Sequence, residues 1–327
     1  MPLIHTAKIP AMGREIAITL GLLAVMVAGL AGLAAATGWA ETWASLTALT
    51  AAQVAVLLLL SLGNYGLRAV RWHLYAKVLR LPVDLAQTLR HYLGGFAMTV
   101  TPGRLGELIR LRWIARETGA PADRAAPLIV VDRAADLAAM GLLIATAVAF
   151  SAAGLAGGVP VALAALGLAL IATRARLALA VLDWIFARLR RWPRLFARLC
   201  RAARALGPFS AWQVALPALA LGFAGWFAEG FAFFLLLGWL GAEVGLWSAV
   251  GVFMIAMVSG GLTGAPGGLG GAEAAMVALL SLQNVPIEIS LPATAVIRLT
   301  TLWFAIAIGL AVFPFATRAA HKAAHVA

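Results

Sequence analysis

Nine charged side chains interrupt apolar stretches of this chain, and their types and spacing suit a site for a charged group. They are Arg104, Glu107, Arg110, Asp132, Arg133, Asp136, Glu229, Glu273 and Arg298. A charge at the centre of a membrane helix costs about 2.5 to 3.5 kcal/mol, so such residues are either paired or functional. The first three recur at i, i+3 and i+6, which places them along one face of a regular helix.

Arginine suits a phosphate because its planar guanidinium donates two parallel hydrogen bonds. We therefore expect Arg104, Arg133 and Arg298 to contact an anionic headgroup. Three carboxylates then balance these arginines or contact a cationic substituent of the headgroup: Glu107, Asp136 and Glu273. The alternative is that the buried charges form internal salt bridges. For Asp132 and Glu229 both interpretations stay open.

Two smaller groups of residues complete the expected substrate site. Asn64 and Arg68 form a cluster with Arg71 and Trp72 at the end of an apolar segment. Most clusters of this kind anchor a helix at the membrane interface, but Asn64 and Arg68 are also candidates for headgroup binding. The second group is the pair Gly267 and Gly268, which either permits close helix packing or lets the backbone approach the headgroup.

These glycines belong to a phrase that occurs twice, as Pro102-Gly103-Arg104-Leu105-Gly106 and as Pro266-Gly267-Gly268-Leu269-Gly270. Proline lacks a backbone donor and glycine disfavours helix, so each copy predicts a helix break. Paired breaks in two halves of an apolar chain are typical of transporter sites. Because the first copy has Arg104 where the second has Gly268, we expect the first to contribute more to headgroup binding.

The composition excludes a soluble protein. Of the 327 residues, 63% are hydrophobic and 12% are charged, whereas soluble domains carry about 25% charged residues. The net charge of +12 comes from short basic stretches between apolar segments, so we interpret it as a topology signal and as contacts to anionic lipid, not as a nucleic-acid surface. The single cysteine, Cys200, excludes an intramolecular disulfide.

About 20 apolar residues cross the hydrocarbon core of a bilayer. Six stretches predict full crossings: 15–37, 47–70, 125–150, 158–174, 211–238 and 290–314. The connections 38–46, 151–157, 239–246 and 284–289 contain no Lys or Arg, whereas the others are basic. By the positive-inside rule, both termini of this multi-pass protein are cytoplasmic.

The two stretches that contain the repeated phrase do not fit as simple crossings. Residues 85–118 are flanked by basic residues on both sides, so we expect a re-entrant hairpin that enters from the cytoplasm. Residues 247–283 lie between connections without Lys or Arg, so this hairpin enters from the opposite face. Irregular backbone at membrane depth requires protein or a water-filled cavity around it, so both tips are expected to meet in the interior.

These elements predict an all-α polytopic membrane protein in which one integral membrane domain, 1–327, contains an inverted repeat. The first repeat is 47–150 and the second is 211–314, with opposite directions through the membrane. Pro266 follows Pro102 by 164 residues, and the same offset from Arg133 ends one residue before Arg298. Residues 174–204 interleave arginines with aromatic residues, which indicates a basic amphipathic segment on the inner leaflet.

Five ordered motifs resemble the lysylphosphatidylglycerol synthase transmembrane-region family, also called flippase-like. They are Asn64 to Trp72, Thr101 to Glu107 with Arg110, Val131 to Arg133 with Asp136, Ala265 to Gly270 with Glu273, and Val296 to Arg298. The resemblance implies lipid handling in a bacterial or archaeal cytoplasmic membrane. Family members that transfer lysine join this region to a soluble transferase domain, and the chain ends at Ala327, so we expect no lysyl transfer.

The first functional hypothesis is a lipid translocase that moves an anionic or aminoacylated phospholipid across the bacterial inner membrane. The alternatives are a membrane-embedded lipid-modifying transferase and a non-catalytic partner of a lipid or cell-envelope enzyme. The histidines form no cluster with cysteine or carboxylates at ligand spacing, so no metal, cofactor or catalytic residue is expected. Expected partners are membrane lipids, with a homo-oligomer or a lipid-biosynthesis enzyme left open.

Overall fold

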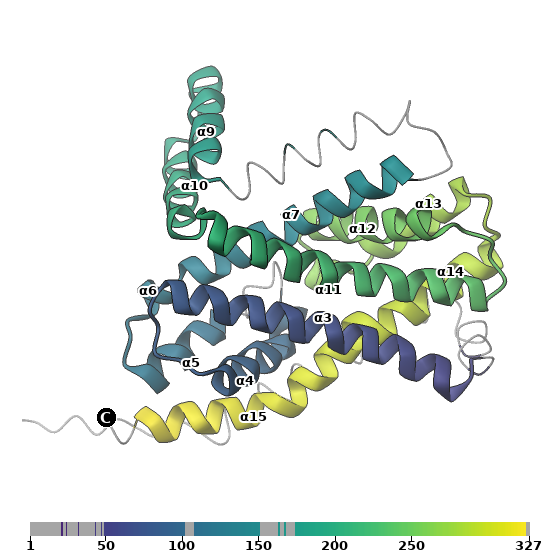
Figure 1. Cartoon of the computed structure of the whole chain (residues 1–327), viewed down its shortest axis with the longest axis horizontal. Helices are drawn as coiled ribbons and strands as arrows, with labels where there is room; N and C mark the ends of the chain where they lie inside the picture. Colours follow the sequence, from purple (N-terminus) through teal and green to yellow (C-terminus); the bar gives the residue numbers. More distant parts are fainter. Residues whose placement is uncertain are drawn as a thin grey trace, which may run out of the picture.

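The computed structural model describes residues 49–101, 108–150 and 174–324, together with the single positions 21, 24, 32, 43, 47, 163 and 167. Throughout this part of the chain the secondary structure is helical, without strands (Figure 1). Three helical stretches are long and apolar enough to cross a membrane: Ala51–Val78, Trp212–Trp239 and Ile287–Ala323. The predicted all-α membrane fold is confirmed. The predicted crossings 15–37 and 158–174 fall almost entirely outside the described residues.

Two long helices pack together at the centre of the protein, α3 (Ala51–Val78) and α11 (Trp212–Trp239). They run in opposite directions (Figure 1). Thr50 and Gln53 form a capping box that starts α3, which satisfies backbone donors at the helix end. Since α3 continues to Val78, the predicted end at residue 70 was too early, and Arg71 and Trp72 lie inside the helix.

The two stretches with the repeated phrase each form a pair of helices. The first consists of α4 (Leu85–Gly95), the 3-10 turn η1 (Phe96–Val100) and α5 (Ile109–Thr118). The second consists of α12 (Leu246–Leu262), η4 (Pro266–Gly268) and α13 (Gly271–Leu282). We call them hairpin 1 and hairpin 2. Residues 102–107, with the first copy of the phrase, lie outside the described residues, and how deep either hairpin enters a membrane stays a prediction.

Each hairpin packs against a long helix from the other half of the chain. Hairpin 1 packs against α15 (Phe304–Ala324), whereas hairpin 2 packs against α7 (Pro127–Phe150). The turns η1 and η4 contact each other, so the two hairpins meet inside the bundle. The division of the chain into two inverted repeats stays a prediction, and this reciprocal packing is an arrangement that such a repeat would produce.

A wide π-helical turn, Leu299–Trp303, joins α14 (Ile287–Arg298) to α15. Turns of this kind are rare and are frequent at functional sites. Arg298 is the last residue before the turn. The span therefore carries a buried arginine directly beside its π-helical turn.

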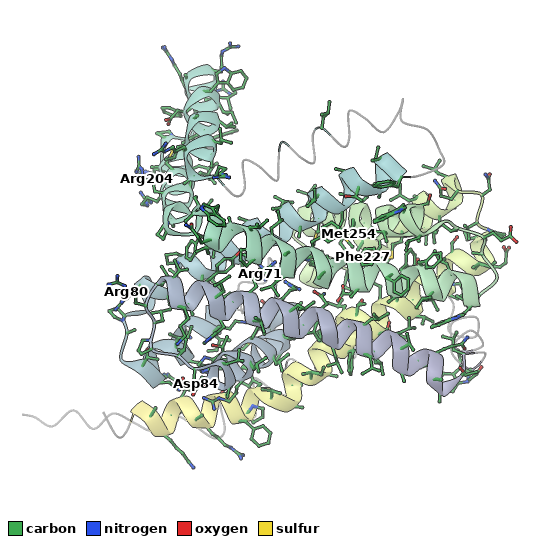
Figure 2. The ribbon with its side chains drawn as sticks, viewed as in Figure 1. Arg71, Arg80, Asp84, Arg204, Phe227 and Met254 are labelled. Carbon is green, nitrogen blue, oxygen red and sulfur yellow. The ribbon has the colours of Figure 1, made fainter. Side chains whose placement is uncertain are left out.

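Two shorter helices run across the direction of the long ones, α9 (Ala175–Leu189) and α10 (Pro193–Ala205) (Figure 1). The short elements α6 (Ala122–Ala125) and η3 (Gly207–Phe209) complete the described helices. Arg80 and Arg204 lie at the end of the bundle from which α9 and α10 project (Figure 2). The connections from α11 to α12 and from α13 to α14 lie at the other end (Figure 1). The basic segments therefore gather at one end, while the cytoplasmic placement of that end stays a prediction.

Candidate functional site

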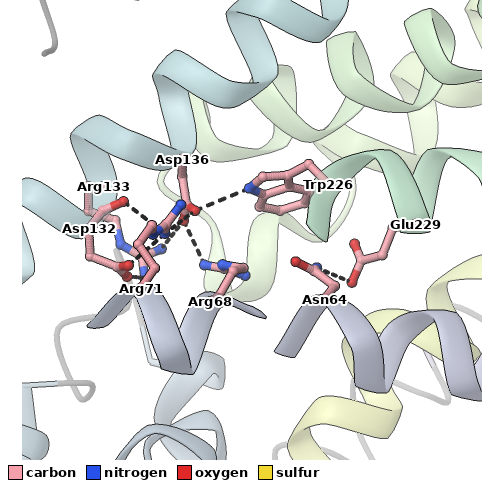
Figure 3. Close-up of polar contacts among 8 residues, drawn as sticks. All are labelled: Asn64, Arg68, Arg71, Asp132, Arg133, Asp136, Trp226 and Glu229. Carbon is pink, nitrogen blue, oxygen red and sulfur yellow. Dashed lines mark hydrogen bonds and ion pairs between the residues drawn. The ribbon is translucent and has the colours of Figure 1, made fainter. Parts of the chain in front are cut away.

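Helices α3 and α7 are joined by a buried network of arginines and aspartates (Figure 3). Arg71 Nη2 lies 2.6 Å from Asp132 Oδ1 and 2.6 Å from Asp136 Oδ1. Arg68 Nη2 lies 2.6 Å from Asp136 Oδ2. Arg68 and Arg71 are one helical turn apart on α3, and the two aspartates are one turn apart on α7, so each pair occupies one helix face.

Arg133 and Trp226 complete this network from its two sides (Figure 3). Arg133 donates a hydrogen bond of 3.0 Å to Asp132, and the Trp226 indole donates one of 3.1 Å to Asp136. The guanidinium of Arg68 lies over the Trp226 ring, 4.9 Å from its centroid. Three arginines face two aspartates, so the network has one more positive than negative charge.

Arg298 forms the second charged group, between α14 and hairpin 2. Its Nε donates a 2.5 Å hydrogen bond to Glu273 of α13, and its Nη2 donates a 2.8 Å bond to the carbonyl of Gly267. The Arg298 side chain is 3% exposed and that of Glu273 is 12% exposed. This arginine therefore holds the tip of hairpin 2 through one charge pair and one backbone carbonyl.

A cavity of about 330 Å³ lies between α7 and hairpin 2, with both charged groups on its wall. Arg133 and Asp136 line it from α7, Trp226 lines it from α11, and Arg298 lines it from α14. Gly267 and Gly268 contribute the hairpin tip. Ligand pockets in proteins measure about 300 to 1,000 Å³, so this cavity has room for a headgroup-sized ligand.

Comparison with protein-family models matches residues 15–309 to the lysylphosphatidylglycerol synthase transmembrane region. The chain belongs to this family. The expected family is therefore confirmed, and the protein is an integral membrane protein of a lipid-related family. No curated protein matches the chain.

In this member of the family, the structure brings part of the expected site together. Five of the predicted residues line the cavity, and a sixth, Glu273, is paired with one of them. The five are Arg133, Asp136, Gly267, Gly268 and Arg298. Asp132 and Arg68 belong to the same network but do not line the cavity. Arg104 and Glu107 lie outside the described residues. The greater contribution expected from the first copy of the phrase therefore stays a prediction.

Gly268 shows why a glycine stands at the tip of hairpin 2. Its φ of +70° lies in the left-handed region, and an added Cβ would lie 3.1 to 3.2 Å from the backbone of Gly260 on α12. Both the conformation and the space exclude a side chain. Close packing therefore requires this glycine, and its position on the cavity wall is compatible with the headgroup interpretation as well.

Arg110 and Asn64 lie elsewhere. Arg110 is fully buried, with its guanidinium 4.4 Å from the ring centroid of Tyr92 and 5.3 Å from that of Trp72. The amide of Asn64 donates a 2.6 Å hydrogen bond to Glu229, and both residues are buried (Figure 3). Neither Arg110 nor Asn64 lines the cavity. Asn64, Arg68 and Arg71 are buried within the protein, and the placement of this part of α3 at a membrane interface stays a prediction.

Sequence reasoning missed two members of the site, Arg71 as a partner of both aspartates and Trp226. Asn64, Arg68 and Arg71 recur at i, i+4 and i+7, and this single-face spacing was the available signal for Arg71. Trp226 has no charged neighbour in sequence and gave no such signal. Among the described residues, no three His, Cys, Asp or Glu side chains are grouped so that they could hold a metal.

Proposed function

We propose that this protein is a lipid translocase whose cavity between α7 and hairpin 2 binds the anionic headgroup of a phospholipid. The observation that carries the proposal is that one cavity receives an arginine from each half of the chain, Arg133 from α7 and Arg298 from α14. Each guanidinium can donate to phosphate oxygens. In transporters with two related halves, the substrate lies between the halves in this way.

The two arginines take different roles in this proposal. Arg298 is nearly buried and already donates to Glu273 and to Gly267, so it positions the hairpin tip and presents its remaining donor surface to the ligand. Arg133 has a side chain that is 36% exposed. Its aspartate partners keep their bonds to Arg68 and Arg71 if Arg133 turns away, so Arg133 can reach a headgroup without leaving a buried charge unpaired.

Charge balance favours a headgroup with a phosphate. Arg298 and Glu273 cancel, and the network on α3 and α7 has three arginines against two aspartates, with Glu229 bound to Asn64 beside it. A phosphodiester has one negative charge, which the partly exposed guanidinium of Arg133 can pair with on the cavity wall. An aminoacylated headgroup would place its amine near a carboxylate, for which Asp136 on the cavity wall is the candidate.

The test is lipid transport by purified protein in liposomes. Fluorescent phosphatidylglycerol, lysylphosphatidylglycerol, phosphatidylethanolamine and phosphatidylcholine are placed in one leaflet, and their appearance in the other is followed by chemical quenching. We expect Arg133→Gln to slow transport of the preferred lipid about tenfold to a hundredfold, because a hydrogen bond to a charged group is worth about 1.5 to 3 kcal/mol.

Arg112→Gln is the matched control. It removes the same charge from an exposed position on hairpin 1, so its rate should equal that of the wild-type protein. Wild-type protein that moves none of the four lipids, with or without an ion gradient, would overturn the proposal. Equal loss of transport in Arg133→Gln and Arg112→Gln would show that transport does not depend on the cavity.

A further inference from the structure

The helices α9 and α10 form a basic hairpin that the transport proposal does not use. Residues 174–204 contain nine arginines and one aspartate, which makes +8 of the chain's net charge of +12. The two helices pack against each other, with the rings of Phe186 and Phe196 at a centroid distance of 5.1 Å. The hairpin projects from the end of the bundle and runs across the long helices (Figure 1).

The exposed surface of this hairpin is both apolar and basic. Its large exposed apolar side chains are Leu177, Trp184, Phe186, Leu189, Trp192, Leu195 and Leu199. Arg190, Arg191, Arg194, Arg201 and Arg204 are exposed beside them. On α10, Leu195 and Leu199 lie one turn apart, and Arg194 and Arg201 lie on the adjoining face. The ring of Trp184 lies under the guanidinium of Arg188 at 5.1 Å.

We infer that the α9–α10 hairpin docks in the plane of an anionic bilayer surface. A helix whose apolar face carries Trp, Phe and Leu and whose polar face carries arginine is the type that lies in the interface of a membrane. Helices that cross the long spans at the end of the bundle run parallel to such a surface. The positive charge of the hairpin selects anionic lipid, because each arginine near the surface strengthens binding to an anionic bilayer about fivefold.

This occupant fits better than a soluble acidic partner or a second copy. An acidic protein would match the arginines but would leave Trp184, Trp192 and Leu195 to be covered by an apolar surface of its own. A second copy would bring a charge of +8 against another +8, which repels. An anionic bilayer supplies negative headgroups and an apolar layer together.

The experiment uses the whole protein in single-copy nanodiscs. Leu195→Cys is introduced with Cys200→Ala, which removes the chain's one natural cysteine, and a spin label is attached. Discs contain phosphatidylcholine alone or with about one third phosphatidylglycerol. Collisional accessibility to oxygen and to a water-soluble nickel complex reports the depth of the label. We expect the label to lie in lipid in anionic discs and to become water-accessible in neutral discs or at 1 M salt, where charges are screened.

Arg190, Arg191, Arg194 and Arg201 are then changed together to Gln. We expect this variant to lose the dependence on phosphatidylglycerol. The matched control changes four exposed arginines outside this hairpin, Arg112, Arg116, Arg124 and Arg318, and should keep the dependence on phosphatidylglycerol. A label that stays in water in anionic discs overturns the inference, as does equal immersion in neutral discs. Immersion only in discs with two copies would instead assign the face to a second chain.

Discussion

The two hairpins have the same layout, yet they are held in place by different physical means. Hairpin 1 is fixed by shape: Gly309 of α15 lets η1 approach so closely that an added Cβ would lie 2.7 Å from the carbonyl carbon of Phe96. Hairpin 2 is fixed by charge, through the bond between Arg298 and Glu273. Close packing fails when an atom is added, whereas a charge pair fails when either partner loses its charge. The two hairpins should therefore be sensitive to different kinds of substitution.

The largest expected effect comes from breaking the charge pair of hairpin 2. Arg298→Gln leaves the Glu273 carboxylate without its cation, and removal of one partner of a buried pair costs about 3 to 5 kcal/mol. We expect a large fall in the midpoint of thermal unfolding in detergent. The double variant Arg298→Gln with Glu273→Gln should recover most of the loss. If the single variant is as stable as the double, charge does not hold this hairpin.

The next largest effect is expected where η1 of hairpin 1 packs closely against Gly309 of α15. Gly309→Ala places a methyl group against the backbone of Phe96 and Ala97, and overpacking of this kind costs about 1 to 3 kcal/mol. Thermal unfolding should again shift downward. Gly66→Ala on α3 is the control, since an added Cβ there meets no atom within 4 Å. Equal stability of the two variants would mean that close packing of η1 on Gly309 does not hold hairpin 1 in place.

A smaller effect sharpens the comparison at the base of hairpin 1, where Glu117 of α5 contacts two residues of α4. Arg90 Nη2 lies 2.7 Å from Glu117 Oε2, and His91 Nε2 lies 3.1 Å from Glu117 Oε1. Burial raises the pKa of Glu117, but the contact with His91 and the charge and hydrogen bonds of Arg90 outweigh it, so the pKa lies below its usual value.

A lowered pKa means that the contact stabilises the folded protein above the unfolded pKa, near pH 4.3 for glutamate, and that this contribution disappears as the pH falls through the folded pKa. We expect Glu117→Gln to lower stability by less than about 1 kcal/mol at pH 7, because Arg90 is partly exposed. The difference from wild type should vanish in strong acid. Glu243→Gln, at an exposed carboxylate, is the control, and a difference that persists in acid would contradict the assignment.

The break between α12 and α13 could be predicted from the sequence, because the proline and glycines of the second phrase act locally. The first phrase lies outside the described residues, so its break stays a prediction. The expected hairpins 85–118 and 247–283 coincide with α4 to α5 and α12 to α13 within a residue. The end of α3 was misjudged because its last turns contain Arg71 and Trp72, which resemble an interfacial anchor. Arg71 is buried against the aspartates of α7, and Trp72 is buried against hairpin 1. Local sequence carries no record of either contact.

The candidate site was predictable in part for the same reason. Arg133, Asp136 and Arg298 were identified because a charge in an apolar stretch is rare. The assignment of partners was not available, because it depends on the rotation of each helix about its own axis. Arg110 illustrates this, since its neighbours Tyr92 and Trp72 come from two helices whose relative rotation no sequence spacing fixes.

The π-helical turn at Leu299–Trp303 lets a single span serve both hairpins. One helix presents Arg298 to hairpin 2 and, eleven residues later, Gly309 to hairpin 1. A π-turn holds about one residue more than an α-helical turn. In a regular helix, eleven residues make about three full turns, so Arg298 and Gly309 would lie on nearly the same face. The wide turn shifts Gly309 by about one residue, or about 100°, around the helix axis, so one span presents two different faces to the two hairpins. Straightening the turn without removing a residue would bring both faces to the same side.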